Sequence, residues 1–147
     1  MFEFKNWDVD STGTITKNLS FTAFFEKLFL LKFECRGTGS LSKDSTLMAS
    51  YSCTVHENST YEFDQDNNTV KITDGKTSKE FVIEAIPNSE KSADKPLSMF
   101  DKWSVNPSYS SSPIVNDITF NANFTNLYSF KFTLNSADRG EYMCDSD

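Results

Sequence analysis

The residues of this sequence that are best spaced for chemistry are oxygen-bearing side chains near its beginning. In the stretch DVDSTGTI, Asp8, Asp10 and Thr12 stand at alternate positions and Gly13 follows them. This matches the first part of an EF-hand calcium loop, in which alternate oxygens bind the ion and the glycine permits a sharp turn. The twelfth position of such a loop needs a bidentate Glu, but here it is Leu19. The stretch therefore predicts a glycine-containing β-turn, with weak calcium binding as the alternative.

Catalysis by a histidine would have to depend on His56, which is the only histidine in the chain. A catalytic triad or a histidine metal site needs further nucleophilic or ligating groups beside the ring, and the sequence pattern places no Ser or Cys there. The chain also has no C-x-x-C pair, no glycine-rich phosphate loop and no G-x-S-x-G turn. We therefore interpret His56 as a surface or hairpin histidine, and we expect a protein that is not an enzyme and needs no cofactor or metal ion.

The charge of the chain excludes several classes of partner. The formal net charge is −7, and the 14 basic residues are dispersed along the sequence. Contact with nucleic-acid phosphates needs clustered Lys and Arg, so a nucleic-acid partner is not expected. The most apolar run, from Phe21 to Phe33, is too short and too charged to span a bilayer. We expect no insertion into a membrane.

Cysteines and glycosylation sequons favour an extracellular setting. Cys35, Cys53 and Cys144 allow one disulfide and one free thiol. N-x-Ser/Thr sequons occur at four positions, which are Asn18, Asn58, Asn67 and Asn123. The first residues carry charge where a signal peptide would be apolar, so the chain is either a mature fragment or a cytosolic protein. We favour a secreted or cell-surface glycoprotein.

The composition and spacing of the apolar residues predict an all-β protein. Fourteen Phe, five Tyr and two Trp stand among many Ser and Thr residues, a mixture that favours pleated, half-buried strands. FEFKNWDV and TITKNLSFTAFF form a predicted hairpin, and Asp74-Gly75 is the strongest turn signal between two further strands. About nine short strands at this spacing predict a single domain over residues 1–147, an antiparallel two-sheet sandwich of immunoglobulin-like or jelly-roll-like type.

One element has two interpretations. KLFLLKFEC is an apolar run of strand length, whereas LSFTAFFEKLFLL also fits a helix with Phe21, Phe24, Phe25 and Leu28 on one face. The alternative to a strand is thus a short helix near residues 20–31.

The end of the sequence carries a recognisable pattern. Leu134, Asp138, Gly140, Tyr142 and Cys144 follow the order Leu-x-x-x-Asp-x-Gly-x-Tyr-x-Cys. This resembles the E–F corner of the immunoglobulin superfamily. The resemblance implies a structural corner at Asp138 and Tyr142, with the tyrosine hydroxyl bonded to upstream backbone. It also implies that Cys144 points inward toward a partner sulfur.

Strand character on both sides of Cys53 favours the pair Cys53–Cys144, with Cys35–Cys144 as the alternative. The resemblance further implies recognition of another protein, through loops or a sheet face. We therefore predict a non-enzymatic extracellular recognition or adhesion module with a protein partner, self-association included. The alternative is a lipocalin-like β-barrel that carries a small apolar ligand in a Phe-lined cavity.

Overall fold

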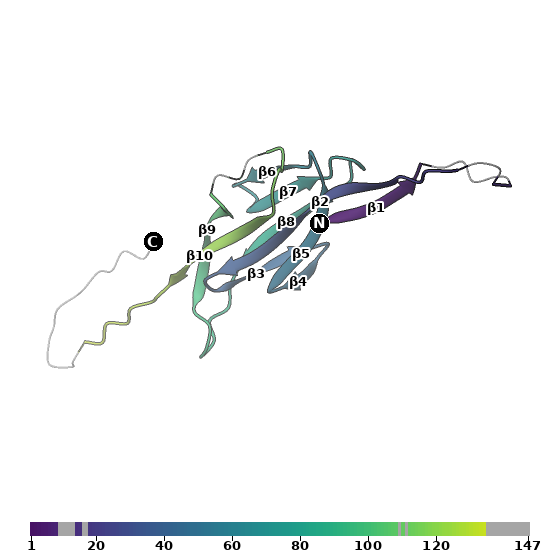
Figure 1. Ribbon diagram of the computed structural model, residues 1–147. Helices are drawn as coiled ribbons and strands as arrows, with labels where there is room; N and C mark the ends of the chain where they lie inside the picture. Colours follow the sequence, from purple (N-terminus) through teal and green to yellow (C-terminus); the bar gives the residue numbers. More distant parts are fainter. Residues whose placement is uncertain (9–13, 16–17, 109, 111, 135–147) are drawn as a thin grey trace.

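The computed structural model describes residues 1–8, 14–15, 18–108, 110 and 112–134, and these form two β-sheets that pack face to face. The first sheet consists of β1 (Phe2–Trp7), β2 (Ala23–Arg36), β5 (Ser50–His56), β9 (Leu97–Asn106) and β10 (Ile118–Leu127) (Figure 1). The second consists of β3 (Gly39–Lys43), β4 (Thr46–Met48), β6 (Thr60–Asp64), β7 (Thr69–Thr73) and β8 (Glu80–Pro87). The predicted all-β sandwich is confirmed.

Two alternatives to this architecture are wrong. The sheets remain open and are not closed into a barrel, so the lipocalin-like alternative loses its structural basis. The short helix near residues 20–31 is also wrong, because β2 covers most of this stretch and the described part of the chain contains no helix. This stretch forms a strand because β2 lies at the centre of its sheet. Its side chains Phe29, Leu31 and Phe33 face the second sheet, whereas Lys32 between them is exposed.

The centre of the first sheet combines antiparallel and parallel pairing. β5 pairs with β2 antiparallel, from Leu28 opposite His56 onward. On its other edge β2 pairs with β10 in parallel, with Ile118 opposite Leu31, and this pair departs from a purely antiparallel sandwich. β9 then closes this side as the antiparallel partner of β10. The topology does not identify an immunoglobulin domain specifically.

Two hydrogen bonds show where β1 lies. The amide of Leu28 donates to the carbonyl of Met1 at 2.8 Å, and the amide of Leu30 donates to Asp117 Oδ1 at 2.8 Å. Amides two residues apart point to the same side of a strand. β1 and β10 therefore flank the same edge of β2, and β5 flanks the other.

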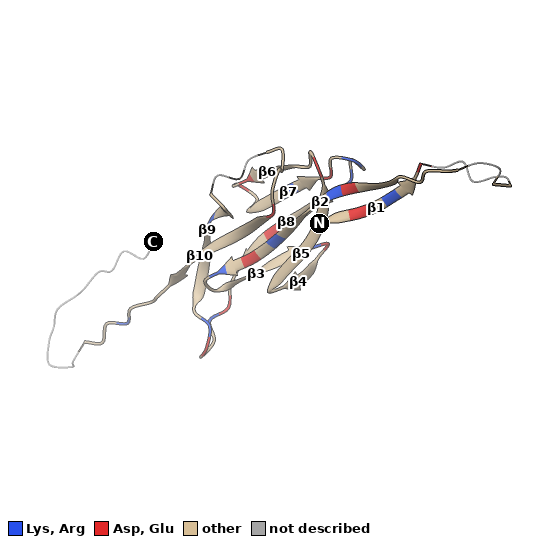
Figure 2. Ribbon diagram, in the orientation of Figure 1, with Lys and Arg blue, Asp and Glu red and all other residues tan. Residues whose placement is uncertain are grey.

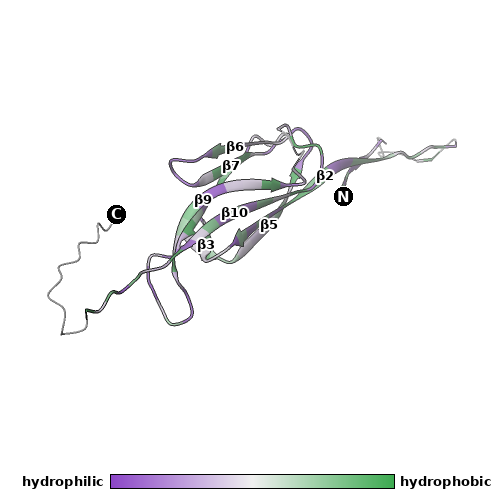
Figure 3. Ribbon diagram, turned by 90° about the vertical axis from the view of Figure 1, so that its left-hand side faces the viewer, coloured by the Kyte–Doolittle hydropathy of each residue, from purple (hydrophilic) through white to green (hydrophobic). Residues whose placement is uncertain are grey.

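Aromatic rings fill the space between the sheets. Phe33 of β2 stacks on Phe120 of β10 with ring centroids 4.9 Å apart, and Tyr61 and Phe81 of the second sheet meet this pair edge-on. Figure 3 shows hydrophobic residues, in green, along the strands of both layers. Trp103 lies in the same core, and its indole N–H donates to the carbonyl of Asn68 at 3.1 Å. A helix long and apolar enough to cross a membrane does not occur among the described residues.

Candidate functional site

A two-stranded arm projects from one end of the sandwich. It consists of β1 and the first part of β2, residues Ala23–Lys27, which pair antiparallel beyond the body of the protein (Figure 1). We call it the aromatic arm. The register places Phe4 opposite Phe25, and the bulge between Phe4 and Asn6 returns Trp7 to the same face opposite Ala23. The predicted antiparallel pairing of the N-terminal strands is confirmed for Ala23–Phe25, but described residues 14–15 and 18–22 are not strand and the predicted DSTG turn lies outside the described residues.

One face of this arm is aromatic and open to solvent. Phe2, Phe4, Trp7 and Phe25 form this aromatic face, and their exposed fractions are 68%, 47%, 56% and 59%. The Phe4 ring lies 5.7 Å from Trp7 and 5.9 Å from Phe25, measured between centroids. The rings therefore form a contiguous apolar surface.

The aromatic face continues the interior of the sandwich. Along β2, Phe25 points to the same side as Phe29, Leu31 and Phe33, because alternate residues of a strand share a face. In the body, the second sheet covers that face and buries these three side chains. Over the arm no described strand takes this place. The arm thus extends the first sheet of the sandwich without a described strand of the second sheet packed on it.

Ion pairs fix the base of the arm to the body. Glu26 of β2 binds Lys5 of β1, with Lys5 Nζ 3.0 Å from Glu26 Oε1, and it also binds Lys76 in the turn between β7 and β8. Hydrogen bonds from Lys76 and then from Lys5 lower the pKa of Glu26. His56 Nε2 lies 3.6 Å from Glu26 Oε2. These contacts connect both strands of the arm to the second sheet.

Asp74 organises the turn that carries Lys76. Its carboxylate accepts the backbone amide of His56 at 3.0 Å and the backbone amide of Thr77 at 2.8 Å. It also accepts His56 Nδ1 at 2.9 Å and Thr77 Oγ1 at 2.9 Å. Burial alone would raise the pKa of Asp74, but the hydrogen bonds from His56 and Thr77 outweigh burial and lower it. Because an ionised carboxylate only accepts, His56 Nδ1 carries the hydrogen.

A hollow of about 500 Å³ lies at this corner, lined by parts of the arm base, by His56 and by the adjoining turns. His56 thus lies half-buried between two carboxylates, more tightly held than a surface histidine. The nearby hydroxyl of Ser59 donates to the backbone carbonyl of His56 at 2.6 Å and accepts from the amide of Gly75 at 2.9 Å. It does not contact the ring. The hydrogen bonds of the described residues thus give His56 and Asp74 a structural role between β5 and the turn.

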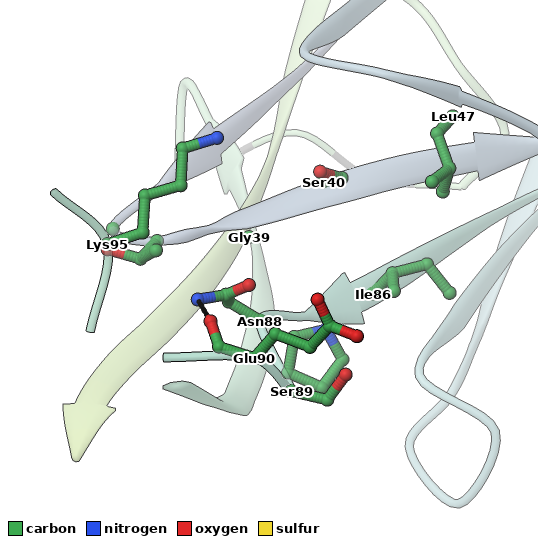
Figure 4. Close-up of a pocket in the computed structure, with 11 residues that line it drawn as sticks. Gly39, Ser40, Leu47, Ile86, Asn88, Ser89, Glu90 and Lys95 are labelled. Carbon is green, nitrogen blue, oxygen red and sulfur yellow. Dashed lines mark hydrogen bonds between the residues drawn. The ribbon is translucent and has the colours of Figure 1, made fainter. Parts of the chain in front are cut away.

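A second hollow, of about 430 Å³, lies at the opposite end of β2 (Figure 4). Its walls come from the start of β3, the end of β8 and the loop that follows. The Asn88 amide donates to the carbonyl of Glu90 at 2.7 Å and to that of Pro96 at 2.8 Å, which fixes the loop. Figure 4 shows polar and apolar side chains mixed around this hollow, with Glu90 and Lys95 at its rim.

The chain leaves the sandwich at this same end with a second exposed apolar surface. After β10, residues 128–134 continue without pairing to any described strand. We call them the C-terminal apolar segment. Its apolar side chains stand at every second position and are exposed, with fractions of 75% for Tyr128, 87% for Phe130, 76% for Phe132 and 52% for Leu134.

The predicted calcium and corner residues fall mostly on parts that the structure leaves out. Asp8 is described, and its amide donates to the carbonyl of Thr22 at 2.9 Å, but Asp10 and Thr12 lie outside the described residues. Within the described part, no group of three or more His, Cys, Asp or Glu side chains could hold a metal ion. The corner residues Asp138 and Tyr142 also lie outside it.

Two of the three cysteines are described, and they form no disulfide with each other. Cys53 lies opposite Leu31 in the β2–β5 ladder, four positions from Cys35, so the two sulfurs are not neighbours. Burial raises the pKa of Cys35, and it raises the pKa of Cys53 to about 11. Cys144 lies outside the described residues, so its pairing with Cys53 or Cys35 stays a prediction.

The four sequon asparagines have different surroundings. Asn18, Asn58 and Asn67 are exposed, and the side-chain nitrogen of Asn67 donates to Asp64 Oδ2 at 2.7 Å. Asn123 lies within β10, and its side-chain nitrogen donates to the carbonyls of Lys102 and Asn121 and to Ser104 Oγ, at 2.9–3.1 Å. Folding therefore occupies the nitrogen of Asn123 that a glycan would need.

Sequence reasoning missed the aromatic arm as a site, although Phe2 and Phe4 had predicted a strand. Alternation shows that one face of a strand is apolar, but it does not show whether another layer covers that face. Comparison of the chain with family models, with curated proteins and with solved structures finds no match.

Proposed function

We propose that this chain is a non-enzymatic recognition module that binds another protein through the aromatic face of its arm. The observation that carries the proposal is the projection of four half-exposed or more exposed aromatic side chains beyond the sandwich. Contiguous exposed apolar surface of this kind marks interaction sites, because leaving it in water is unfavourable. Large aromatic side chains also dominate the energetics of protein interfaces.

The surroundings of the aromatic face fit a binding surface. Glu3, Lys5, Glu26 and Lys27 alternate in charge along the two strands of the arm, and Figure 2 shows acidic and basic residues interspersed on β1 and β2. Glu3 and Glu26 lie opposite each other on the other face of the arm, whereas Lys27, opposite Phe2, lies on the aromatic side and gives it the polar border usual in protein interfaces. The mixed signs of charge favour a protein partner over a polyanion.

The corner at the arm base holds His56 in place, with its Nδ1 bonded to Asp74 and its Nε2 facing Glu26. These contacts stabilise the position of the arm. The non-enzymatic role is part of the proposal. The extracellular setting is also part of the proposal, and the exposure of Asn18, Asn58 and Asn67 is compatible with glycosylation there.

The proposal is tested with an arm variant and a matched control. Phe4→Ser with Phe25→Ser removes the centre of the aromatic face. Val82→Ser with Met99→Ser removes two other exposed apolar side chains, 44% and 52% exposed, from the body. Binding of the labelled chain to a panel of purified extracellular proteins, this chain included, should weaken at least about tenfold for the arm variant and stay unchanged for the control. Equal binding by both variants would contradict the proposal.

A further inference from the structure

We propose that the protein partner is a second copy of this chain, and that the C-terminal apolar segment of one copy packs on the aromatic face of the next. This deepens the proposed function and rests on it, since it assigns an occupant to the same face. The segment supplies the layer that the arm lacks, as the second sheet does over the body. Two sheets of a sandwich pack about 10 Å apart, a spacing that one row of interdigitated side chains fills.

The two surfaces match in chemistry and in length. As an extended strand, the segment would place Tyr128, Phe130, Phe132 and Leu134 on one side and Ser129, Lys131 and Thr133 on the other. The polar side keeps contact with water when the apolar side is covered. The arm offers four aromatic side chains, along the six residues of β1 and the five residues of β2 that pair with it. A seven-residue extended segment is long enough to cover them.

A single molecule cannot make this contact with itself. Asn123 pairs with Arg36, so Leu127 lies four positions past the end of β2, whereas Phe25 lies eleven positions before that end. At about 3.3 Å per residue, roughly 50 Å separates the start of the segment from the arm, but residues 128–134 span at most about 23 Å. Figure 1 and Figure 3 both show the arm and the segment at opposite ends of the molecule.

The area is sufficient for a reversible contact. With about 200 Å² for each large side chain, the exposed fractions give roughly 450 Å² on the arm and 550 Å² on the segment. The sum of about 1,000 Å², reached when all of this surface is covered, is in the range of weak, transient protein interfaces. The assembly should therefore depend on protein concentration.

Because the two surfaces differ, the contact is heterologous. A heterologous contact between surfaces at opposite ends adds copies head to tail and produces open chains or rings. Each copy then contributes its C-terminal apolar segment, which we call the donor, to one neighbour and its aromatic arm, which we call the acceptor, to another. Mutations can disable the donor and the acceptor separately.

The decisive experiment uses one variant of each kind in the full-length chain. The acceptor variant carries Phe4→Ser and Phe25→Ser, and the donor variant carries Phe130→Ser and Phe132→Ser. These side chains are exposed, so the fold should be retained, and the fluorescence of buried Trp103 checks this. Analytical ultracentrifugation should show concentration-dependent oligomers for the wild type and monomers for each variant alone. A mixture of the two variants should give one-to-one heterodimers and nothing larger, since only one intact pair of surfaces remains.

Other outcomes overturn the inference and separate it from the proposed function. A monomeric wild type at all concentrations would refute self-assembly, while arm-dependent binding to a different protein would leave the proposed function intact. Donor variants that still dimerise through the arm would show an arm-to-arm contact in its place. Failure of every partner, this chain included, to depend on the arm would refute both proposals.

A peptide of residues 127–134 gives a second readout on the intact chain. Trp7 lies on the arm and is 56% exposed, whereas Trp103 is 5% exposed and buried in the core. Binding of the peptide should shift the Trp7 emission to shorter wavelength in the donor variant. A peptide with Ser in place of Phe130 and Phe132 should have no effect. Equal shifts with both peptides would contradict the assigned contact.

Discussion

Asp74 shows how much a single side chain can fix at the corner of two sheets. It bonds to the backbone of β5 through His56 and to its own turn through Thr77, and this turn places Lys76 against the arm. The sequence pattern predicted the turn from Asp74-Gly75, but it could not predict the contact with His56. That contact depends on two hairpins from different parts of the chain meeting at one edge.

Replacement of Asp74 by Asn should lower the stability and change its dependence on pH. A carboxyl group whose pKa is lowered by folding stabilises the protein above its ordinary pKa, and this contribution is lost as the pH falls through the lowered value. The wild type should therefore lose stability below about pH 4. Asp74→Asn should reduce the free energy of unfolding by about 1–3 kcal/mol at pH 7.

Urea unfolding followed by Trp103 fluorescence between pH 2 and pH 7 measures this effect. The loss below pH 4 should be smaller in Asp74→Asn than in the wild type. Asp101→Asn, at an exposed position of β9, serves as the control and should retain the wild-type profile. Identical profiles for both variants would show that Asp74 does not couple folding to protons.

At the scale of elements, the sequence predicts which side chains of a strand share a face. It does not predict which other element packs on that face. The TVKIT and SKEFVIEAI strands correspond to β7 and β8, and their period of two places Val70, Ile72 and Ile83 in the core. The apolar residues before Leu28 also fitted a helical period, so local pattern alone left that element open. Pairing of β2 on both edges, which is a tertiary effect, decides for the strand.

The approach of β3 to β10 gives a prediction about sheet spacing. Gly39 of β3 lies against the ring of Phe124 in β10, and a Cβ atom at Gly39 would overlap that ring. Gly39→Ala should therefore push the two strands apart and destabilise the protein by about 1–3 kcal/mol. The double variant Gly39→Ala with Phe124→Leu should recover part of this loss relative to Phe124→Leu alone. Additive losses in thermal unfolding would show that the two positions do not meet.

For the whole molecule, the sequence predicted the sandwich but not its connectivity. Composition and strand spacing are properties of the chain as a whole. A wrong assignment of one element therefore does not change the predicted fold class. The parallel pairing of β2 with β10 leaves no local signal, because it joins strands from the two ends of the sequence. The aromatic arm could not be predicted from the local sequence either. Its residues are of the same types as core residues, and they differ only because no second sheet packs on them.

The half-buried thiols report on the integrity of the sandwich. Cys53 packs against the core and is partly shielded, and its pKa is raised to about 11, so at pH 8 it is protonated. Its labelling by an aromatic disulfide reagent should require opening of the sandwich, and its rate should follow the global free energy of unfolding. The measurement is made on Cys35→Ser with Cys144→Ser, which leaves one thiol. Fast labelling that is independent of urea would show that the β2–β5 region opens by itself.

The parallel pair at the centre of the first sheet has a consequence for biosynthesis. A ribosome releases β2 early, but the strand that completes its other edge begins only at Ile118. Until β10 emerges, the nascent chain holds an apolar strand with an unpaired edge, which is a template for pairing with other chains. Such late, non-local pairing also slows folding. The molecule is therefore expected to depend on protection during translation more than its size alone would suggest.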